Sequence, residues 1–189
     1  MSIDKNGVIE EIIVRLKKYK SIGRPLPHGL VSKLGKKCVL DKLNGLGFKK
    51  LTPDKRKANI YIDYNGKKIN VKIRTSTLKN EGLYPKDVKY WGWTVKEWDK
   101  QEIEYDILVG VALNDDFVGA QFYIFTREEA LLIDDIRIKR FKNVQNKIHL
   151  FESEEAYRKA IEKPKIVTKY ERYINENKSE FLCKWAKIR

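Results

Sequence analysis

The sequence predicts an α/β fold: a central mixed β-sheet with a β-hairpin, flanked by helices, with extra helices at the N- and C-termini. Apolar residues recur at helical spacing before residue 47 and again after residue 153, whereas residues 58–76 alternate apolar with polar side chains. The β-branched, apolar run Ile107–Leu113 indicates a buried strand. Strands in the middle of a chain and helices at both ends are typical of a sheet covered by helices.

We expect one domain over residues 1–189, because a chain of 189 residues can bury a single sizeable core. Residues 30–132 form that core, and residues 133–189 form a C-terminal helical extension packed on it. The longest apolar run is too short to cross a bilayer, and the N-terminus lacks the pattern of a secretion signal. We therefore expect a cytoplasmic protein without a membrane partner.

Two helices are predicted at the N-terminal end, at about Val8–Tyr19 and Leu30–Leu46, because apolar residues fall on one face of each. A loop rich in glycine and proline, residues 23–29, separates them. Both cysteines, Cys38 and Cys183, lie within apolar helical patterns, so we expect buried thiols in a reducing compartment.

A hairpin is predicted from residues 58–64 and 67–76, because Asn65-Gly66 favours the type I′ turn that joins two strands. A two-residue turn sets the register, with Tyr64 opposite Lys67, and Asn59 opposite Lys72. One face then carries only Ile60, Ile62, Ile69, Val71 and Ile73, and it must be the core side. The other face is polar and carries Asn59, Tyr61, Asp63, Lys68, Asn70, Lys72 and Arg74.

Beyond the hairpin, residues 77–101 are predicted to be irregular, and residues 121–125 form a further strand. Thr126 and Glu129 have the spacing of a capping box, which opens a helix to about residue 133. A basic loop follows, then a helix at about 153–162. A second capping box at Thr168 opens a final helix that extends to Ile188.

The strongest compositional signal is the formal net charge of +14. Residues 1–58 contain 15 Lys and Arg against five Asp and Glu, so most of the excess lies there. A polyanion bound by such a surface releases its counterions, which favours binding without regard to sequence. We expect a nucleic acid as the partner. A solvated, lysine-rich surface without a partner is the alternative.

The hairpin resembles that of the PD-(D/E)XK nuclease superfamily, which has the restriction-endonuclease-like fold. In that family a helix with Gly-Glu precedes a hairpin of the form Ala-Asp-Ile, Asn-Gly-Lys and Glu/Gln-Val-Lys-Thr-Ser. Here the helix reads Lys33-Leu-Gly-Lys-Lys37, and the hairpin reads Ala58-Asn-Ile, Asn65-Gly-Lys67 and Val71-Lys-Ile-Arg-Thr-Ser76. The resemblance covers residues 30–132, and it implies that fold and DNA as the substrate.

The resemblance also implies Mg²⁺ held by carboxylates, but this sequence departs from the motif at each of those positions. Lys36 replaces the helix Glu, Asn59 the Asp, Lys72 the Glu, and Arg74 the Lys. Cations in place of carboxylates repel Mg²⁺ and attract phosphate. Asn59, Lys72 and Arg74 are therefore degenerate catalytic positions, and we expect no cofactor. Mg²⁺ would be required only if the site had migrated to Asp63 or Asp54.

The residues expected to contact nucleic acid are cations, hydroxyls and one tryptophan around this hairpin. Trp91 is included because an aromatic ring can stack on a base, although burial as a core residue is its alternative. The full set is Lys36, Lys37, Lys55, Arg56, Lys57, Lys68, Thr75, Ser76 and Trp91.

Three functions follow from these observations. The first is a DNA-binding protein on a nuclease-like fold with an inactive site, either a homodimer or the companion of an active nuclease subunit. The second is an active Mg²⁺-dependent endonuclease of the restriction or defence type, with relocated acidic ligands. The third is a structural or RNA-associated basic protein, for which RNA replaces DNA as the partner.

Overall fold

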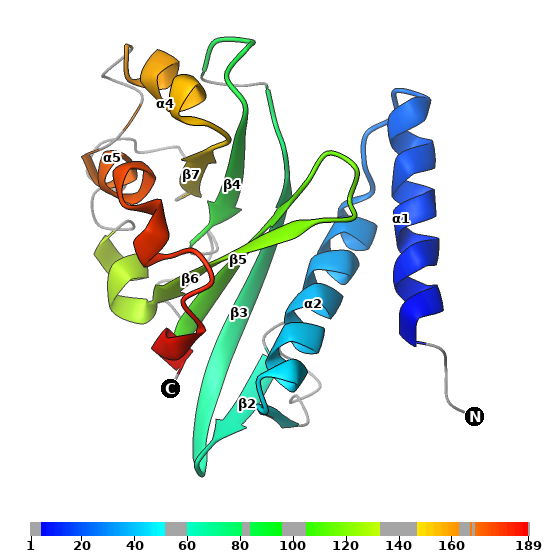
Figure 1. Cartoon of the computed structure of the whole chain (residues 1–189), viewed down its shortest axis with the longest axis vertical. Coiled ribbons are helices and arrows are strands. Elements are labelled where there is room, and N and C mark those ends of the chain that lie inside the picture. The colour runs from blue at the N-terminus through cyan, green and yellow to red at the C-terminus, as the bar shows by residue number, and fades with distance from the viewer. Residues whose placement is uncertain are drawn as a thin grey trace.

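A computed structural model describes residues 5–51, 60–80, 84–95, 105–132, 147–162, 167 and 169–188. The protein has an α/β fold with a mixed central sheet of five strands flanked by helices. In Figure 1, helices α1 and α2 lie along one side of this sheet, and a second, two-stranded sheet with α4 and α5 lies on the other side. Among the helices within these residues, none has the length and apolar character that crossing a bilayer requires.

The two predicted N-terminal helices are present as α1 (Lys5–Ser21) and α2 (His28–Gly45). Leu16 of α1 and Leu34 of α2 are fully buried in the cluster that fills the space between the helices and the sheet. Gly47 follows α2 with a φ of 82°, a left-handed conformation that glycine adopts without strain. The helical spacing of apolar residues therefore predicted both helices correctly.

The five-stranded sheet has the strand order β1-β2-β3-β5-β6. Strands β3 and β5 are parallel, and every other neighbouring pair is antiparallel, which makes the sheet mixed. The strands are β1 (Lys49–Leu51), β2 (Ile60–Tyr64), β3 (Lys67–Thr77), β5 (Ile107–Leu113) and β6 (Ala120–Thr126).

The hairpin of β2 and β3 has the predicted register. Tyr64 pairs with Lys67 and Asp63 with Lys68, and the turn residues Asn65 and Gly66 have φ values of 53° and 79°. Positive φ at both positions is the requirement of the type I′ turn. On the predicted core face, Ile60, Ile62, Ile69 and Val71 are buried and Ile73 is partly buried.

Each face of the sheet makes one close contact that only glycine permits. On the α2 face, a Cβ atom added to Gly35 would lie 1.9 Å from Thr75 Oγ1, so the helix lies directly on β3. On the opposite face, a Cβ atom added to Gly110 would lie 2.9 Å from Trp93 Cδ2. The indole of Trp93 therefore packs flat against the middle of β5 and closes the second core cluster.

The second sheet consists of β4 (Tyr90–Thr94) and β7 (Lys147–Phe151), which are antiparallel. The prediction that residues 77–101 are irregular was wrong for β4, and β7 was not predicted. Trp91 and Trp93 lie two residues apart on the same face of β4, and both side chains are buried in the second core cluster. Their indole N–H groups donate to the carbonyls of Leu113 and Val111, 3.0 and 3.1 Å away, which ties β4 to β5.

The C-terminal part begins as predicted and then departs from the prediction. The capping box is confirmed: Thr126 N–H donates to Glu129 Oε2 at 2.8 Å, and Glu129 N–H donates to Thr126 Oγ1 at 3.3 Å. Ser153 caps α4 (Glu154–Ile161) through a bond from Ala156 N–H.

The prediction of one final helix to Ile188 was wrong. Helix α5 (Lys169–Glu176) is followed only by short 3₁₀ turns at Lys178–Glu180 and Trp185–Ile188. The backbone of Phe181 and Cys183 instead hydrogen-bonds to β6, which covers the edge of the sheet. Cys183 is consequently exposed with a φ of 53°, and Cys38 is only partly buried, so neither thiol is the fully buried group that was expected.

Candidate functional site

A cleft of about 690 Å³ lies at the carboxyl end of β3. One wall is the loop before α2 and the first turn of that helix, and the other is β4 with the first residue of β7. The end of β3 runs between these walls. The lining residues are Pro25, Leu26, His28, Val31, Arg74, Thr75, Ser76, Thr77, Leu78, Lys79, Asn80, Gly92, Trp93, Thr94 and Lys147.

The cleft is lined by positive charge. Arg74, Lys79 and Lys147 contribute three cations, and the lining residues that the structure describes include no Asp or Glu. The first turn of α2 also faces the cleft through His28, and it contains no acidic residue. The positive end of the helix dipole adds to the field of the three side chains. The site therefore favours an anionic ligand.

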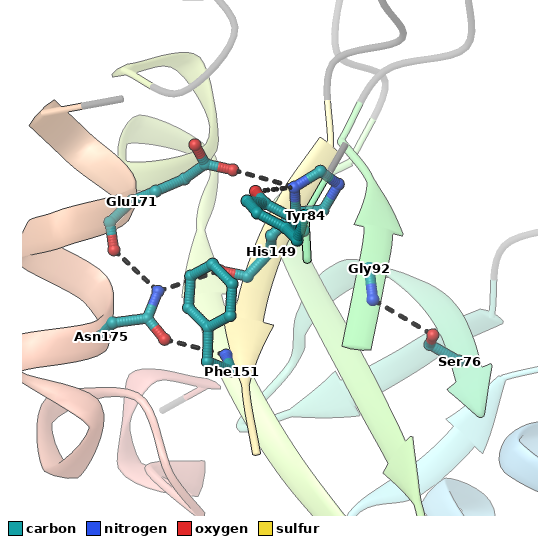
Figure 2. Close-up of polar contacts among 7 residues, drawn as sticks. All are labelled: Ser76, Tyr84, Gly92, His149, Phe151, Glu171 and Asn175. Carbon is teal, nitrogen blue, oxygen red and sulfur yellow. Dashed lines mark hydrogen bonds and ion pairs between the residues drawn. The ribbon is translucent and has the colours of Figure 1, made fainter. Parts of the chain in front are cut away.

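Hydrogen bonds between β3 and β4 hold the floor of the cleft. The Gly92 N–H donates to Ser76 Oγ at 3.1 Å (Figure 2), and the Ser76 hydroxyl donates to the Thr77 carbonyl at 2.9 Å. Lys79 and Tyr90 exchange two backbone hydrogen bonds of 2.9 Å each. Because its hydroxyl is committed to these bonds and is buried, Ser76 shapes the cleft.

A buried polar network lies behind Gly92. His149 is the cross-strand partner of Gly92, and a Cβ atom added to Gly92 would lie 3.2 Å from the imidazole. The imidazole Nδ1 lies 2.7 Å from Tyr84 Oη and 3.3 Å from Glu171 Oε1 (Figure 2). His149 and Glu171 are both buried. The absence of a side chain at Gly92 therefore makes room for the imidazole against β4.

Asn175 joins this network to α5. Its Oδ1 accepts a bond from Phe151 N–H at 2.9 Å, and its Nδ2 donates to the carbonyls of His149 and Glu171 at 3.0 and 2.8 Å (Figure 2). The amide thus pairs with the outer edge of β7 as a neighbouring strand would. Lys178 donates to the Phe151 carbonyl at 2.7 Å, and burial lowers the pKa of this lysine. These contacts fix β7, and with it Lys147, relative to the rest of the fold.

Some of the predicted site residues meet at the cleft. Arg74, Thr75 and Ser76 line it, and Lys72 lies two residues earlier on the same face of β3 as Arg74. Lys36 is partly buried on α2, immediately after the glycine that contacts Thr75. Lys37 forms an ion pair with Asp41 at 2.7 Å.

Other predicted residues lie elsewhere. Lys68 and Asp63 face each other near the turn of the hairpin, at the opposite end of β3 from the cleft. Trp91 is 6% exposed and its N–H is bound to β5, so its position does not favour stacking on a base. Asn59, Lys55, Arg56, Lys57 and Asp54 lie outside the described residues.

Sequence reasoning missed two of the three cations that line the cleft. Lys79 lies just beyond the predicted end of the strand, and Lys147 lies in a basic stretch that was interpreted as a loop or a charged strand edge and not as part of the site. A period-two pattern from Lys147 to Phe151, with polar residues at 147 and 149, could have indicated the strand. Nothing in the sequence pairs that segment with β4, because the two strands are more than 50 residues apart.

The residues present at the motif positions do not fit Mg²⁺. Lys36, Lys72 and Arg74 offer no oxygen ligand, whereas Mg²⁺ prefers carboxylates and other oxygen donors. Across the described part of the chain, His, Cys, Asp and Glu side chains form no group of three or more that could hold a metal ion. Arg74, Lys79 and Lys147, which line the cleft, are donors suited to phosphate oxygens.

The bacterial homing endonuclease I-Ssp6803I is similar over 80% of this chain and 94% of its own, with a TM-score of 0.42 and 12% sequence identity. No family model matches the chain, and no curated protein matches it.

Proposed function

We propose that this protein binds the phosphodiester backbone of a nucleic acid, in the first place DNA, through the cleft at the end of β3. The observation that carries the proposal is the convergence of Arg74, Lys79 and Lys147 on one cleft whose described lining holds no carboxylate. Arginine and lysine supply charge and directed donors to phosphate oxygens. The net charge of +14 supports a polyanion over a small anionic metabolite.

The choice of DNA rests on the hairpin sequence, which resembles the PD-(D/E)XK nucleases. Because the carboxylate positions of that motif hold Lys36, Asn59 and Lys72, we propose binding without cleavage. Such a protein would recognise DNA on its own or for an active partner subunit. RNA is the second candidate, and competition between duplex DNA and duplex RNA at equal salt separates the two.

Neutralising the cleft is expected to weaken DNA binding strongly. In the variant Arg74→Gln/Lys79→Gln/Lys147→Gln, loss of up to three phosphate contacts should reduce the slope of log K against log salt by about two to three units. Binding to a 20-base-pair duplex is measured by fluorescence anisotropy over a salt series. The control, Lys18→Gln/Lys86→Gln/Lys184→Gln, removes the same charge from exposed positions outside the cleft. Equal slopes for the two variants would refute the assignment of the cleft.

Incubation with plasmid DNA distinguishes binding from cleavage. We expect retarded migration and no fragments in EDTA, Mg²⁺ or Mn²⁺, because the motif positions lack metal ligands. Discrete, metal-dependent fragments that disappear with Asp63→Asn or Asp54→Asn would contradict this expectation. They would establish an active endonuclease with relocated ligands.

A further inference from the structure

The end of the hairpin carries a second cluster of positive charge, separate from the cleft. Strand β1 pairs with β2, and β2 pairs with β3. Lys49 of β1 therefore lies opposite Asp63 of β2, which in turn lies opposite Lys68 of β3. Four exposed lysines lie at this end of the hairpin: Lys49 and Lys68 on its polar face, and Lys50 and Lys67 on the opposite face, because successive residues of a strand alternate between faces. We call this group the hairpin-end cluster.

The hairpin end extends beyond the parallel pairing of the sheet. Strand β5 pairs with β3 from Val71 onward, and among the described strands the segment from Lys67 to Asn70 pairs with β2. Asp106 closes the junction, because its carboxylate accepts from Asn70 N–H at 2.8 Å and its own N–H donates to the Asn70 carbonyl at 2.9 Å. Figure 1 shows the turn at the bottom of the molecule, at the far end of β3 from β4 and β7. The hairpin-end cluster therefore lies at the tip of the hairpin, whose base is held to the residue before β5 by the bonds between Asn70 and Asp106.

The four lysines outnumber Asp63, the carboxylate that lies between Lys49 and Lys68. Asp63 Oδ1 accepts a bond from Gly66 N–H at 3.2 Å, which directs that oxygen toward the turn. Lys68 Nζ lies 4.1 Å from the centre of the Tyr61 ring, on the same face of the hairpin. Within the described residues, no ion pair involves any lysine of the hairpin-end cluster. All four lysines are exposed, and Lys49 and Lys68 share the face of the hairpin that carries Arg74 further along β3.

The cluster and the cleft lie on one line along β3. Lys68 and Arg74 are six residues apart, which places both side chains on the same face of the strand. At about 3.3 Å per residue, the two positions are separated by roughly 20 Å. Base pairs of B-DNA rise about 3.4 Å each, so this span corresponds to about six base pairs.

We propose that the hairpin-end cluster is a second contact to the backbone of the same DNA duplex, about six base pairs from the cleft; this inference rests on the proposed function of the cleft. A duplex is stiff over about 150 base pairs, so it bridges two cationic sites 20 Å apart without bending. The second contact adds counterion release of about 0.9 units of salt slope for each phosphate neutralised. It also makes affinity depend on duplex length, because a short duplex held in the cleft cannot reach the hairpin.

The test measures Kd for duplexes of 8 to 24 base pairs over a salt series with three full-length proteins. These are the wild type, the hairpin-end variant Lys49→Gln/Lys50→Gln/Lys67→Gln/Lys68→Gln, and a charge-matched control, Lys18→Gln/Lys86→Gln/Lys89→Gln/Lys184→Gln. The control residues are exposed, like those of the cluster. Thermal unfolding confirms that each variant is folded.

We expect the wild type and the control to gain affinity steeply as about six base pairs are added beyond the shortest duplex that binds. The hairpin-end variant should lack that gain, with a salt slope on long duplexes lower by about two units, because two of its lysines, Lys49 and Lys68, lie on the face of Arg74. For the shortest duplex, the affinity of the hairpin-end variant should stay within twofold of the affinity of the control variant. A hairpin-end variant that follows the control at every length would overturn the inference while leaving the cleft in place. Failure of the cleft itself would appear separately, as unchanged binding by the cleft variant.

Discussion

Replacing Asn175 with alanine is expected to lower the free energy of unfolding by about 3–5 kcal/mol. The substitution leaves the Phe151 N–H and the His149 carbonyl without their partner inside the core, and each such group costs about 1–3 kcal/mol. The bond to the Glu171 carbonyl is lost as well. The side chain of Asn175 is 7% exposed, so water does not readily replace these bonds.

The measurement is urea unfolding of the purified protein, monitored by circular dichroism. Asn177→Ala is a matched control, because Asn177 Nδ2 makes the same type of bond to the carbonyl four residues earlier, at 2.8 Å from Tyr173, but near the surface. We expect the control to lose less than about 1 kcal/mol. Similar losses in the two variants would show that the network between α5 and β7 contributes little to stability.

Replacing Gly35 with valine is expected to destabilise the protein by at least about 3 kcal/mol. Even the Cβ atom would lie 1.9 Å from Thr75 Oγ1, and also within 3 Å of Thr75 Cγ2 and Cβ. Because Cβ of the threonine is fixed to the backbone, rotation of its side chain cannot remove the overlap. Helix α2 must then move away from β3, which opens the core beneath it. Overpacking of this kind costs about 1–3 kcal/mol for small additions and more for larger ones.

Two further variants separate this contact from the general effect of glycine in a helix. Gly29→Ala meets nothing within 4 Å, so it should stabilise α2 by up to about 1 kcal/mol through helix propensity. Gly35→Ala should destabilise, and adding Thr75→Gly should recover part of the loss, which a double-mutant cycle measures as a coupling energy. Additive effects of the two substitutions would contradict direct contact between α2 and β3 at this point.

The hairpin shows how much local sequence can predict. Asn65-Gly66 selects a turn whose backbone requires positive φ, and a two-residue turn leaves one register for the strands that it joins. The apolar alternation of Ile60, Ile62, Ile69 and Val71 then specifies the buried face. All of this information lies within about 20 residues, and each part of it was confirmed by the structure.

The candidate site was predicted only in part, because its walls come from distant segments. Arg74 and Thr75 lie in the second strand of the hairpin and were expected near the site, whereas Lys79 and Lys147 were not. Trp91 was expected to contact nucleic acid, but its amphipathic indole is equally suited to the core. The Trp91 ring is buried here because β4 packs on β5, which also accepts the hydrogen bond of the indole. Asn59 and the basic run at 55–57 remain predictions, because they lie outside the described residues.

The sequence alone determined the fold class, the two N-terminal helices, the hairpin with its register, and a surface charge that favours polyanions. These properties depend on short-range patterns and on composition, which are independent of how distant segments meet. Tertiary structure decided that β4 pairs with β7, that the chain after α5 returns to β6, and that Lys147 faces the end of β3. Those outcomes depend on the burial of large side chains such as Trp93 against Gly110. They also depend on the buried amide of Asn175, which hydrogen-bonds to the backbone of β7. Long-range packing therefore determines where the positive charges of this protein converge.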